Sequence, residues 1–213
     1  MIKNIVFDMG NVLVGWTPME FALRAAGNEE DAKVLHAALF EPREWGMADA
    51  GLLSREELLR LALERTPGRL HETMRRLEAD WPLWMRPIEG AEGFVRRCKA
   101  AGMKLYLLSN AGDQFPAVLE NRPFYPLFDG FVVSAHEKLA KPDPRIYRRL
   151  CERFDLKPEE CFFIDDIEAN ILGAASIGMQ GIVFDGDYTK ARKALEEMER
   201  SPPASINQHT AKG

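Results

Sequence analysis

Three segments of the sequence place acidic or hydroxyl side chains directly after short apolar runs. Asp8 follows "IVF", Ser109 and Asn110 follow "LYLL", and Asp165 and Asp166 end or follow "CFFID". Ligands of an open parallel sheet bind at the carboxyl ends of its strands, so we expect these side chains to lie close together. Three carboxylates at short range repel one another, and a cation with oxygen ligands, Mg²⁺ above all, relieves the repulsion. Each residue alone would suit a helix N-cap, but the whole set favours a metal site.

The elements that must position these residues alternate between short apolar runs and helical patterns. Strands buried on both faces have continuous apolar runs, and the helices between them are the crossovers of a parallel sheet. In the strand order 3-2-1-4-5 the first and fourth strands are neighbours, which brings Asp8 to Asp165 and Asp166. The sequence therefore predicts an α/β fold with a Rossmann-like parallel sheet. After the first strand, the expected strands are residues 103–110, 128–134, 161–165 and 181–185, and the expected helices are residues 89–102, 113–121, 143–154 and 168–179.

Residues 16–86 depart from this alternation, because their patterns are all helical and no strand lies between them. Ser54 and Glu57 form the S-x-x-E pattern of a capping box at the start of one of these helices. We expect an α-helical cap inserted after the first strand. The predicted domains are an α/β core of residues 1–15 and 87–199, the cap of residues 16–86, and a mobile, polar tail of residues 200–213.

Composition and charge narrow the class of protein. The chain has 213 residues, 46% of them hydrophobic, and a net charge of −5. The acidic balance argues against nucleic acid as a partner, and no apolar run approaches the ~20 residues that span a bilayer. Three cysteines without a CxxC pair are typical of reduced thiols, so we expect a cytoplasmic protein that binds neither nucleic acid nor membrane. The oligomeric state is left open.

Four short motifs occur in order along the chain, each at a predicted strand end or at the following helix. They are "FDMGNV", "LLSN", "KPDPRIY" and "IDDIEAN". Each string alone is weak evidence, but the four together resemble the motifs of the haloacid dehalogenase-like (HAD) hydrolase superfamily. The chain resembles its phosphatase branch with a helical cap in the C1 position, and in particular small bacterial sugar-phosphate phosphatases of the glucose-1-phosphate type.

This resemblance implies a phosphatase of small phosphorylated metabolites with Mg²⁺ as its cofactor. It assigns the following roles: the nucleophile is Asp8; the phosphate-binding residues are Ser109, Asn110 and Lys141; and the metal site is formed by Asp8, Gly10 through its backbone carbonyl, Asp165 and Asp166.

The chemistry of Asp8 explains why cations are needed. An unperturbed aspartate is ionised at neutral pH, so its attack on a phosphate dianion is electrostatically adverse. At ~4 Å and an effective dielectric constant of ~20, each pair of unit charges costs about 4 kcal/mol. Mg²⁺ and Lys141 offset this repulsion. Attack then gives an aspartyl-phosphate, which water hydrolyses in a second step.

Gly10 is where the sequence departs from the phosphatase pattern. Phosphatases of the superfamily usually carry a second aspartate two residues after the nucleophile, which serves as general acid and then as base. Its absence allows three interpretations: a phosphatase, a 2-haloacid dehalogenase, or a phosphate-binding protein that has lost turnover. Dehalogenation needs no Mg²⁺ and would leave Asp165 and Asp166 without a cation, and the binding protein would have no use for Asp8. We therefore favour the phosphatase.

Without an acid at residue 10, the leaving oxygen receives its proton from Glu44, from Asp49 or from water, or departs unprotonated. The anomeric oxygen of a sugar 1-phosphate carries negative charge better than an ordinary sugar hydroxyl. We therefore expect a preference for hexose 1-phosphates over hexose 6-phosphates.

The cap is expected to select the substrate. Trp45 and Asp49, in the segment "REWGMADAG", are the candidate substrate contacts, with Arg43 and Glu44 nearby. The Trp45 indole would either stack on a sugar face or fill the small helical core of the cap.

Overall fold

The computed structural model describes residues 1–200 and shows a parallel sheet of five strands. The strand order is β3-β2-β1-β4-β5, which confirms the predicted order 3-2-1-4-5 and the α/β fold. The predicted tail lies outside the described residues except for Arg200, which ends the last helix. Among the described helices, none combines the length and the apolar character needed to cross a membrane. The strands are β1 (Asn4–Phe7), β2 (Lys104–Ser109), β3 (Gly130–Val133), β4 (Cys161–Asp165) and β5 (Gln180–Val183).

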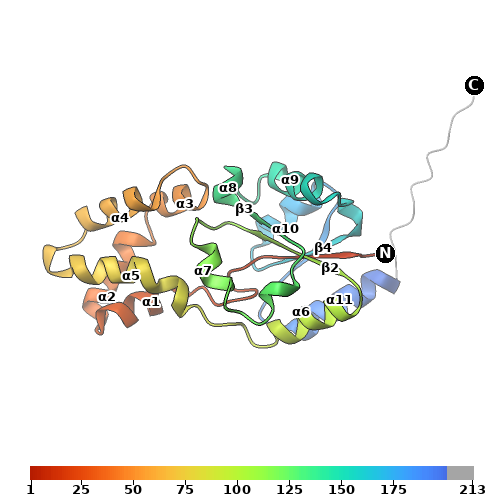
Figure 1. Ribbon diagram of the computed structural model, residues 1–213, viewed down its shortest axis with the longest axis horizontal. Coiled ribbons are helices and arrows are strands. Elements are labelled where there is room, and N and C mark those ends of the chain that lie inside the picture. The colour runs from red at the N-terminus through yellow and green to blue at the C-terminus, as the bar shows by residue number, and fades with distance from the viewer. Residues whose placement is uncertain (201–213) are drawn as a thin grey trace, which may run out of the picture.

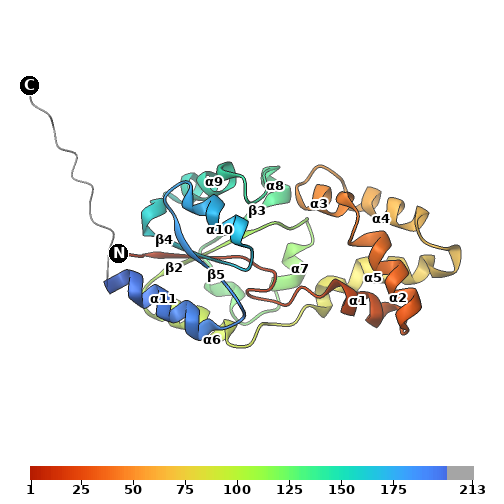
Figure 2. The ribbon, with the colours of Figure 1, turned by 180° about the vertical axis from the view of Figure 1, so that it is seen from behind.

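Helices cover both faces of the sheet (Figures 1 and 2). Because successive side chains of a strand point to opposite faces, Ile5 and Phe7 belong to one hydrophobic cluster and Val6 to the other. The first cluster includes α6 and α11, and the second includes α9 and α10. The helices of this region are α6 (Ala91–Ala100), α7 (Phe115–Leu119), α8 (Ser134–Glu137), α9 (Pro144–Phe154), α10 (Glu168–Ala175) and α11 (Tyr188–Arg200).

Five helices lie between β1 and α6 and extend beyond the carboxyl edge of the sheet (Figure 1). Two neighbouring backbone segments join them to the sheet: the Gly15 amide donates to the Arg86 carbonyl at 2.8 Å, and the Ile88 amide to the Leu13 carbonyl at 3.0 Å. The assignment of residues 16–86 to a separate cap stays a prediction. These helices are α1 (Pro18–Ala26), α2 (Glu29–Leu39), α3 (Arg43–Asp49), α4 (Arg55–Glu64) and α5 (His71–Trp84).

Helix α3 occupies the first seven residues of the segment "REWGMADAG" although that segment contains two glycines. Pro42 precedes the helix as its N-cap, and Gly46 lies inside it, where a Cβ would meet open space. The chain leaves the helix through Gly51, whose φ of +67° lies in the left-handed region that favours glycine. A glycine inside a short helix is tolerated here because α3 packs between α4 and α8.

Candidate active site

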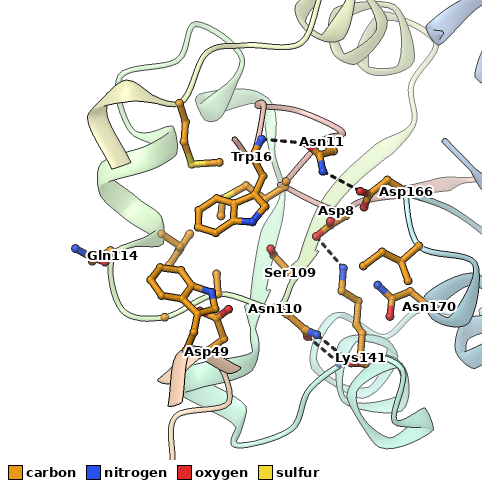
Figure 3. Close-up of a pocket in the computed structure, with 18 of the residues that line it drawn as sticks. Asp8, Asn11, Trp16, Asp49, Ser109, Asn110, Gln114, Lys141, Asp166 and Asn170 are labelled. Atoms are coloured by element: carbon orange, nitrogen blue, oxygen red, sulfur yellow. Dashed lines mark hydrogen bonds and ion pairs between the residues drawn. The ribbon is translucent and has the colours of Figure 1, made fainter. Parts of the chain in front are cut away.

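The predicted site residues converge on one cavity of about 190 Å³ between the carboxyl edge of the sheet and helices α3 and α5. Figure 3 shows Asp8, Ser109 and Lys141 on one side of this cavity, and Trp16 and Asp49 on the other. The predicted site residues that line it are Asp8, Gly10, Trp45, Asp49, Ser109, Asn110, Lys141 and Asp166. Asp165 does not line the cavity; it is fully buried and pairs with Lys141, which does.

Asp8 follows the last residue of β1 and is anchored to the neighbouring strand. The register pairs Phe7 with Ile164, and the Asp8 amide donates to the Ile164 carbonyl at 2.9 Å. One carboxylate oxygen of Asp8, Oδ1, lies 2.7 Å from Lys141 Nζ. Burial raises the pKa of Asp8 to about 6, although Lys141 lowers it. The side chain is therefore mostly ionised at neutral pH and available as a nucleophile.

Lys141 and Asp165 form a buried ion pair behind Asp8. Lys141 Nζ lies 2.6 Å from Asp165 Oδ2, and both side chains are almost completely buried. Burial lowers the pKa of Lys141, but the carboxylates of Asp8 and Asp165 outweigh it and hold the pKa above its usual range. Asp165 also accepts from the Ile167 amide at 2.8 Å and from Asn170 Nδ2 at 2.9 Å. Asp165 thus holds the ammonium group and the start of α10 in place.

Asn110 ties the end of β2 to the segment that carries Lys141. Asn110 Nδ2 donates to the Lys141 carbonyl at 2.9 Å, and the Lys141 amide donates to Asn110 Oδ1 at 2.8 Å. Both ends of the side-chain amide therefore bind the backbone of Lys141 (Figure 3). This pairing positions the lysine, and a direct contact between Asn110 and phosphate stays a prediction. Ser109 is buried at the end of β2 and lines the cavity beside Asn110.

Asp8, Asp165 and Asp166 have one carboxylate oxygen each within 4.8 Å of one another. Lys141 is the one cationic side chain among the described residues that line the cavity, so the three acids exceed the local positive charge. This oxygen-rich, electronegative set fits a hard divalent cation such as Mg²⁺. Asp165 is already occupied by Lys141 and α10, whereas Asp8, Gly10 and Asp166 line the cavity. The Asp8 and Asp166 carboxylates and the Gly10 carbonyl would hold the cation.

Asn11 is a site residue that the sequence analysis missed. Its φ of 51° lies in the left-handed region, which asparagine tolerates better than most residues. Asn11 Nδ2 donates to Asp166 Oδ2 at 3.0 Å, and the Trp16 amide donates to Asn11 Oδ1 at 2.9 Å. The side chain therefore links the turn after β1 to Asp166 and to the beginning of the helical region. The signal was the asparagine of "GNV", a residue type that favours such turns.

Three indoles form an aromatic wall of the cavity. The ring centroid of Trp16 lies 5.3 Å from that of Trp45 and 5.1 Å from that of Trp81. The Trp45 ring packs against other aromatic rings and also lines the cavity, so its stacking on a sugar stays a prediction. Trp81 is 6% exposed, and its Nε1 has no hydrogen-bond partner within residues 1–200.

The structure separates Asp49 from the other charged candidates of the same segment. Asp49, the last residue of α3, lines the cavity, whereas Arg43 and Glu44 do not. Glu44 Oε1 instead pairs with Arg65 Nη2 at 2.8 Å. The Ser134 hydroxyl of α8 bonds to the Asp49 carbonyl. Asp49 therefore lies near the carboxyl edge of the sheet, and Glu44 is held in its ion pair with Arg65.

The comparison with protein families supplies the family of this fold. The family model of the haloacid dehalogenase-like hydrolases matches residues 2–178, which is most of the chain. The protein belongs to this family. The family prediction from the four motifs is thereby confirmed.

Two phosphatases and one solved structure illustrate the similarity. Sesquiterpene phosphatase astK of Aspergillus oryzae is 26% identical over 84% of this chain and 88% of its own length. Glyceraldehyde 3-phosphate phosphatase of Pyrococcus furiosus is 24% identical over 89% of this chain and 83% of its own. The HAD family enzyme BT-2542 of Bacteroides thetaiotaomicron, in complex with magnesium and inorganic phosphate, has a TM-score of 0.69 at 22% identity, covering 90% of this chain and 99% of its own. Haloacid dehalogenases share the fold as well, so the fold alone does not separate the two activities.

Proposed function

We propose that the protein is a Mg²⁺-dependent phosphatase that hydrolyses small phosphate monoesters through an aspartyl-phosphate on Asp8. The observation that carries this proposal is the group of Asp8, Lys141 and Asp166 in one cavity. Lys141 Nζ lies 2.7 Å from the Asp8 carboxylate, and the carboxylates of Asp8 and Asp166 lie within 4.8 Å of each other. A nucleophile, a fixed ammonium group and a cation site are the parts that phosphoryl transfer through aspartate needs.

The side chains divide the work of the reaction. An Asp8 carboxylate oxygen attacks phosphorus, and the ester oxygen departs. Lys141, buried against Asp8, provides positive charge next to the incoming phosphoryl group, and Ser109, which lines the cavity, would donate a hydrogen bond to it. A bound Mg²⁺ would neutralise negative charge on the phosphoryl oxygens. Water then hydrolyses the aspartyl-phosphate and regenerates Asp8.

The acids beside the nucleophile argue against the dehalogenase. Displacing a halide with a carboxylate needs no cation, yet Asp166 lies in the cavity beside Asp8, and within residues 1–200 its side chain accepts only from Asn11 Nδ2. Lys141 is paired with Asp8 and Asp165, so the three acids keep an excess of negative charge that a cation would offset. The similarity to two phosphatases over more than four fifths of this chain supports the same choice.

For the substrate class we propose a compact sugar phosphate. The cavity of about 190 Å³ is smaller than the ~300–1,000 Å³ typical of sites for larger ligands. An extended terpenyl ester would need more room, although the aromatic wall would suit its apolar chain. Indole faces also stack on the C–H faces of sugars. The small volume of the cavity favours the sugar.

A panel of phosphate esters tests the proposal, with sugar phosphates, triose phosphates and a terpenyl phosphate assayed with Mg²⁺ and with excess chelator. We expect phosphate release that stops on chelation and returns with Mg²⁺, and Asp8→Asn should abolish it while the thermal unfolding midpoint is kept. Release that survives chelation, or halide release from 2-haloacids without metal, would favour the dehalogenase. Ester binding without turnover by the wild type would favour the binding protein.

A further inference from the structure

The proposed reaction needs a proton donor that the nucleophile loop does not contain. Gly10 occupies the place of the second aspartate, and a sugar hydroxyl leaves poorly as an alkoxide. Among the described residues, the titratable side chains that line the cavity are Asp8, Asp49, Lys141 and Asp166. Asp8 and Lys141 serve attack and charge balance, and Asp166 serves the cation. Asp49 is the remaining candidate.

We propose that Asp49 is the general acid and base of the reaction, supplied by α3 in place of an aspartate at residue 10. The inference rests on the proposed phosphatase function and adds a catalytic residue to it. Asp49 lies across the cavity from Asp8 and on the side where the leaving group must point, since Ser109 and Lys141 occupy the phosphate side (Figure 3).

Contacts with α8 fix the position of Asp49. The Ser134 hydroxyl donates a hydrogen bond to the Asp49 carbonyl. The Ser134 hydroxyl oxygen also accepts from the Ala111 amide at 2.9 Å, so Ser134 holds both α3 and the end of β2. Two residues later, Gly51 lies so close to α8 that an added Cβ would stand 2.2 Å from the Ala135 carbonyl oxygen. The end of α3 is therefore seated on α8, and its last side chain is held over the cavity.

The surroundings of the Asp49 carboxyl favour its protonated form near neutral pH. Burial raises the pKa of Asp49 to about 7, although hydrogen bonds from the Gly112 amide and the Trp45 side chain lower it. Its place at the C-terminal end of α3 also disfavours negative charge. A pKa near the working pH is suitable for a group that gives a proton in one step and takes one in the next.

The charged groups around Asp49 are largely paired with others. From α4, Arg55 is bound to Glu78 of α5. Near the end of β2, Asp113 pairs with His136 of α8 at 3.4 Å. Across the cavity lie Lys141, which is held by Asp8 and Asp165, and the cation ligand Asp166. No cation is paired with the Asp49 carboxylate among the ion pairs of residues 1–200, so a strong stabilisation of its ionised form is missing.

The proton follows a closed cycle. In the first step an Asp8 oxygen bonds to phosphorus, the bond from phosphorus to the ester oxygen breaks, and this oxygen takes the Asp49 proton and leaves as an alcohol. In the second step the Asp49 carboxylate takes a proton from water, the water oxygen bonds to phosphorus, and the bond from phosphorus to Asp8 breaks. Inorganic phosphate is released, and both aspartates return to their starting states.

The test compares two esters, one whose leaving group needs a proton and one whose leaving group does not. Asp49→Asn keeps the size of the side chain and an oxygen that accepts hydrogen bonds, but it has no acidic proton. With glucose 6-phosphate we expect kcat/KM to fall by ~10²–10⁴-fold, the usual contribution of a general acid. With p-nitrophenyl phosphate, whose leaving group needs no proton, kcat/KM should fall by less than about tenfold. Glu44→Gln, the matched control outside the cavity, should change neither value by more than about twofold.

Two further readouts separate proton transfer from a structural role. Wild-type kcat/KM for glucose 6-phosphate should decline above an apparent pKa near 7, and this decline should be absent in Asp49→Asn. With p-nitrophenyl phosphate, Asp49→Asn should release a burst of one p-nitrophenol per site and then turn over slowly, because water lacks its base in the second step.

Equal losses of kcat/KM for the two esters, or a pH profile unchanged by the substitution, would overturn the role of Asp49 and leave the phosphatase standing. A wild-type protein that is inactive with both esters and with the wider ester panel would overturn both proposals. An active wild type, with an Asp49→Asn variant whose kcat/KM falls far more for glucose 6-phosphate than for p-nitrophenyl phosphate, supports both.

Discussion

At the scale of single residues, the site divides its two neighbouring acids between different tasks. Asp165 is fully buried and accepts from Lys141, Asn170 and the Ile167 amide, whereas Asp166 faces the cavity. A buried carboxylate held by several donors at once is part of the scaffold. A cavity-facing one is available to a cation. The motif "IDD" does not distinguish these roles, because the two acids are adjacent at the end of the same strand.

Substituting each acid separately tests this division. Asp166→Asn should raise the Mg²⁺ concentration for half-maximal activity by tenfold or more, roughly the range found for weakened metal sites, and leave the free energy of unfolding within about 1 kcal/mol. Asp165→Asn should lower the free energy of unfolding by about 3 kcal/mol, because it leaves part of a buried ion pair without its partner. Urea unfolding and Mg²⁺ titration of activity measure the two effects. The reverse pattern would make Asp165 the cation ligand.

The sequence predicts much of the site at this scale, and the reason is geometric. Asp8, Ser109 and Asp165 end or follow buried strands, and parallel strands bring their carboxyl ends to one edge. Asn11 was missed because its role depends on a left-handed turn, and the structural role of Asn110 because its partner is the backbone of Lys141. Contacts between a side chain and a distant backbone leave no periodic pattern in a sequence.

At the scale of elements, the strands and long helices were predictable and α3 was not. A buried parallel strand needs a continuous apolar run, which β2 and β4 display. Helix α3 has seven residues, an internal glycine and no buried residue, so its sequence lacks an apolar stripe. Its conformation comes from packing against α4 and α8. The element that carries Asp49 is thus the one that the sequence defines least.

The close packing of the end of α3 on α8 predicts opposite effects of alanine at Gly46 and at Gly51. Gly51→Ala would place a Cβ 2.2 Å from the Ala135 carbonyl oxygen at a φ of +67°, so α3 must shift, and stability should fall by more than about 1 kcal/mol. Because Asp49 shifts with it, kcat/KM for glucose 6-phosphate should fall more than for p-nitrophenyl phosphate. Gly46→Ala, inside the same helix with open space around it, should stabilise by roughly 0.5–1 kcal/mol and leave both kcat/KM values unchanged. Similar changes in stability and in kcat/KM for the two variants would contradict the close packing of α3 on α8.

At the scale of the whole molecule, the nucleophile and the proposed acid come from distant parts of the chain. Asp8 belongs to the sheet and Asp49 to a helix inserted after it, so a complete site requires both to meet at one cavity. This changes the expectation for the substrate. The sequence analysis expected a preference for hexose 1-phosphates over hexose 6-phosphates because residue 10 is not an acid, and an acid at Asp49 would remove that reason. The preference should instead emerge in Asp49→Asn, whose activity depends on how well the leaving oxygen carries charge.

Moving the acid from the helix back to the nucleophile loop tests this arrangement. A Cβ at Gly10 would lie 3.6 Å from the Trp16 Cβ, an ordinary van der Waals distance, and Gly10 does not have a positive φ, so the backbone accepts a side chain there. Gly10→Asp in the Asp49→Asn background should raise kcat/KM for glucose 6-phosphate at least about tenfold above that of Asp49→Asn. A well-placed general acid contributes ~10²–10⁴-fold. Gly10→Asn in the same background is the matched control, with the same size and no acidic proton. If the aspartate recovers no more activity than the asparagine, the loss in Asp49→Asn is not the loss of a proton donor, and the helix holds Asp49 over the cavity for another purpose.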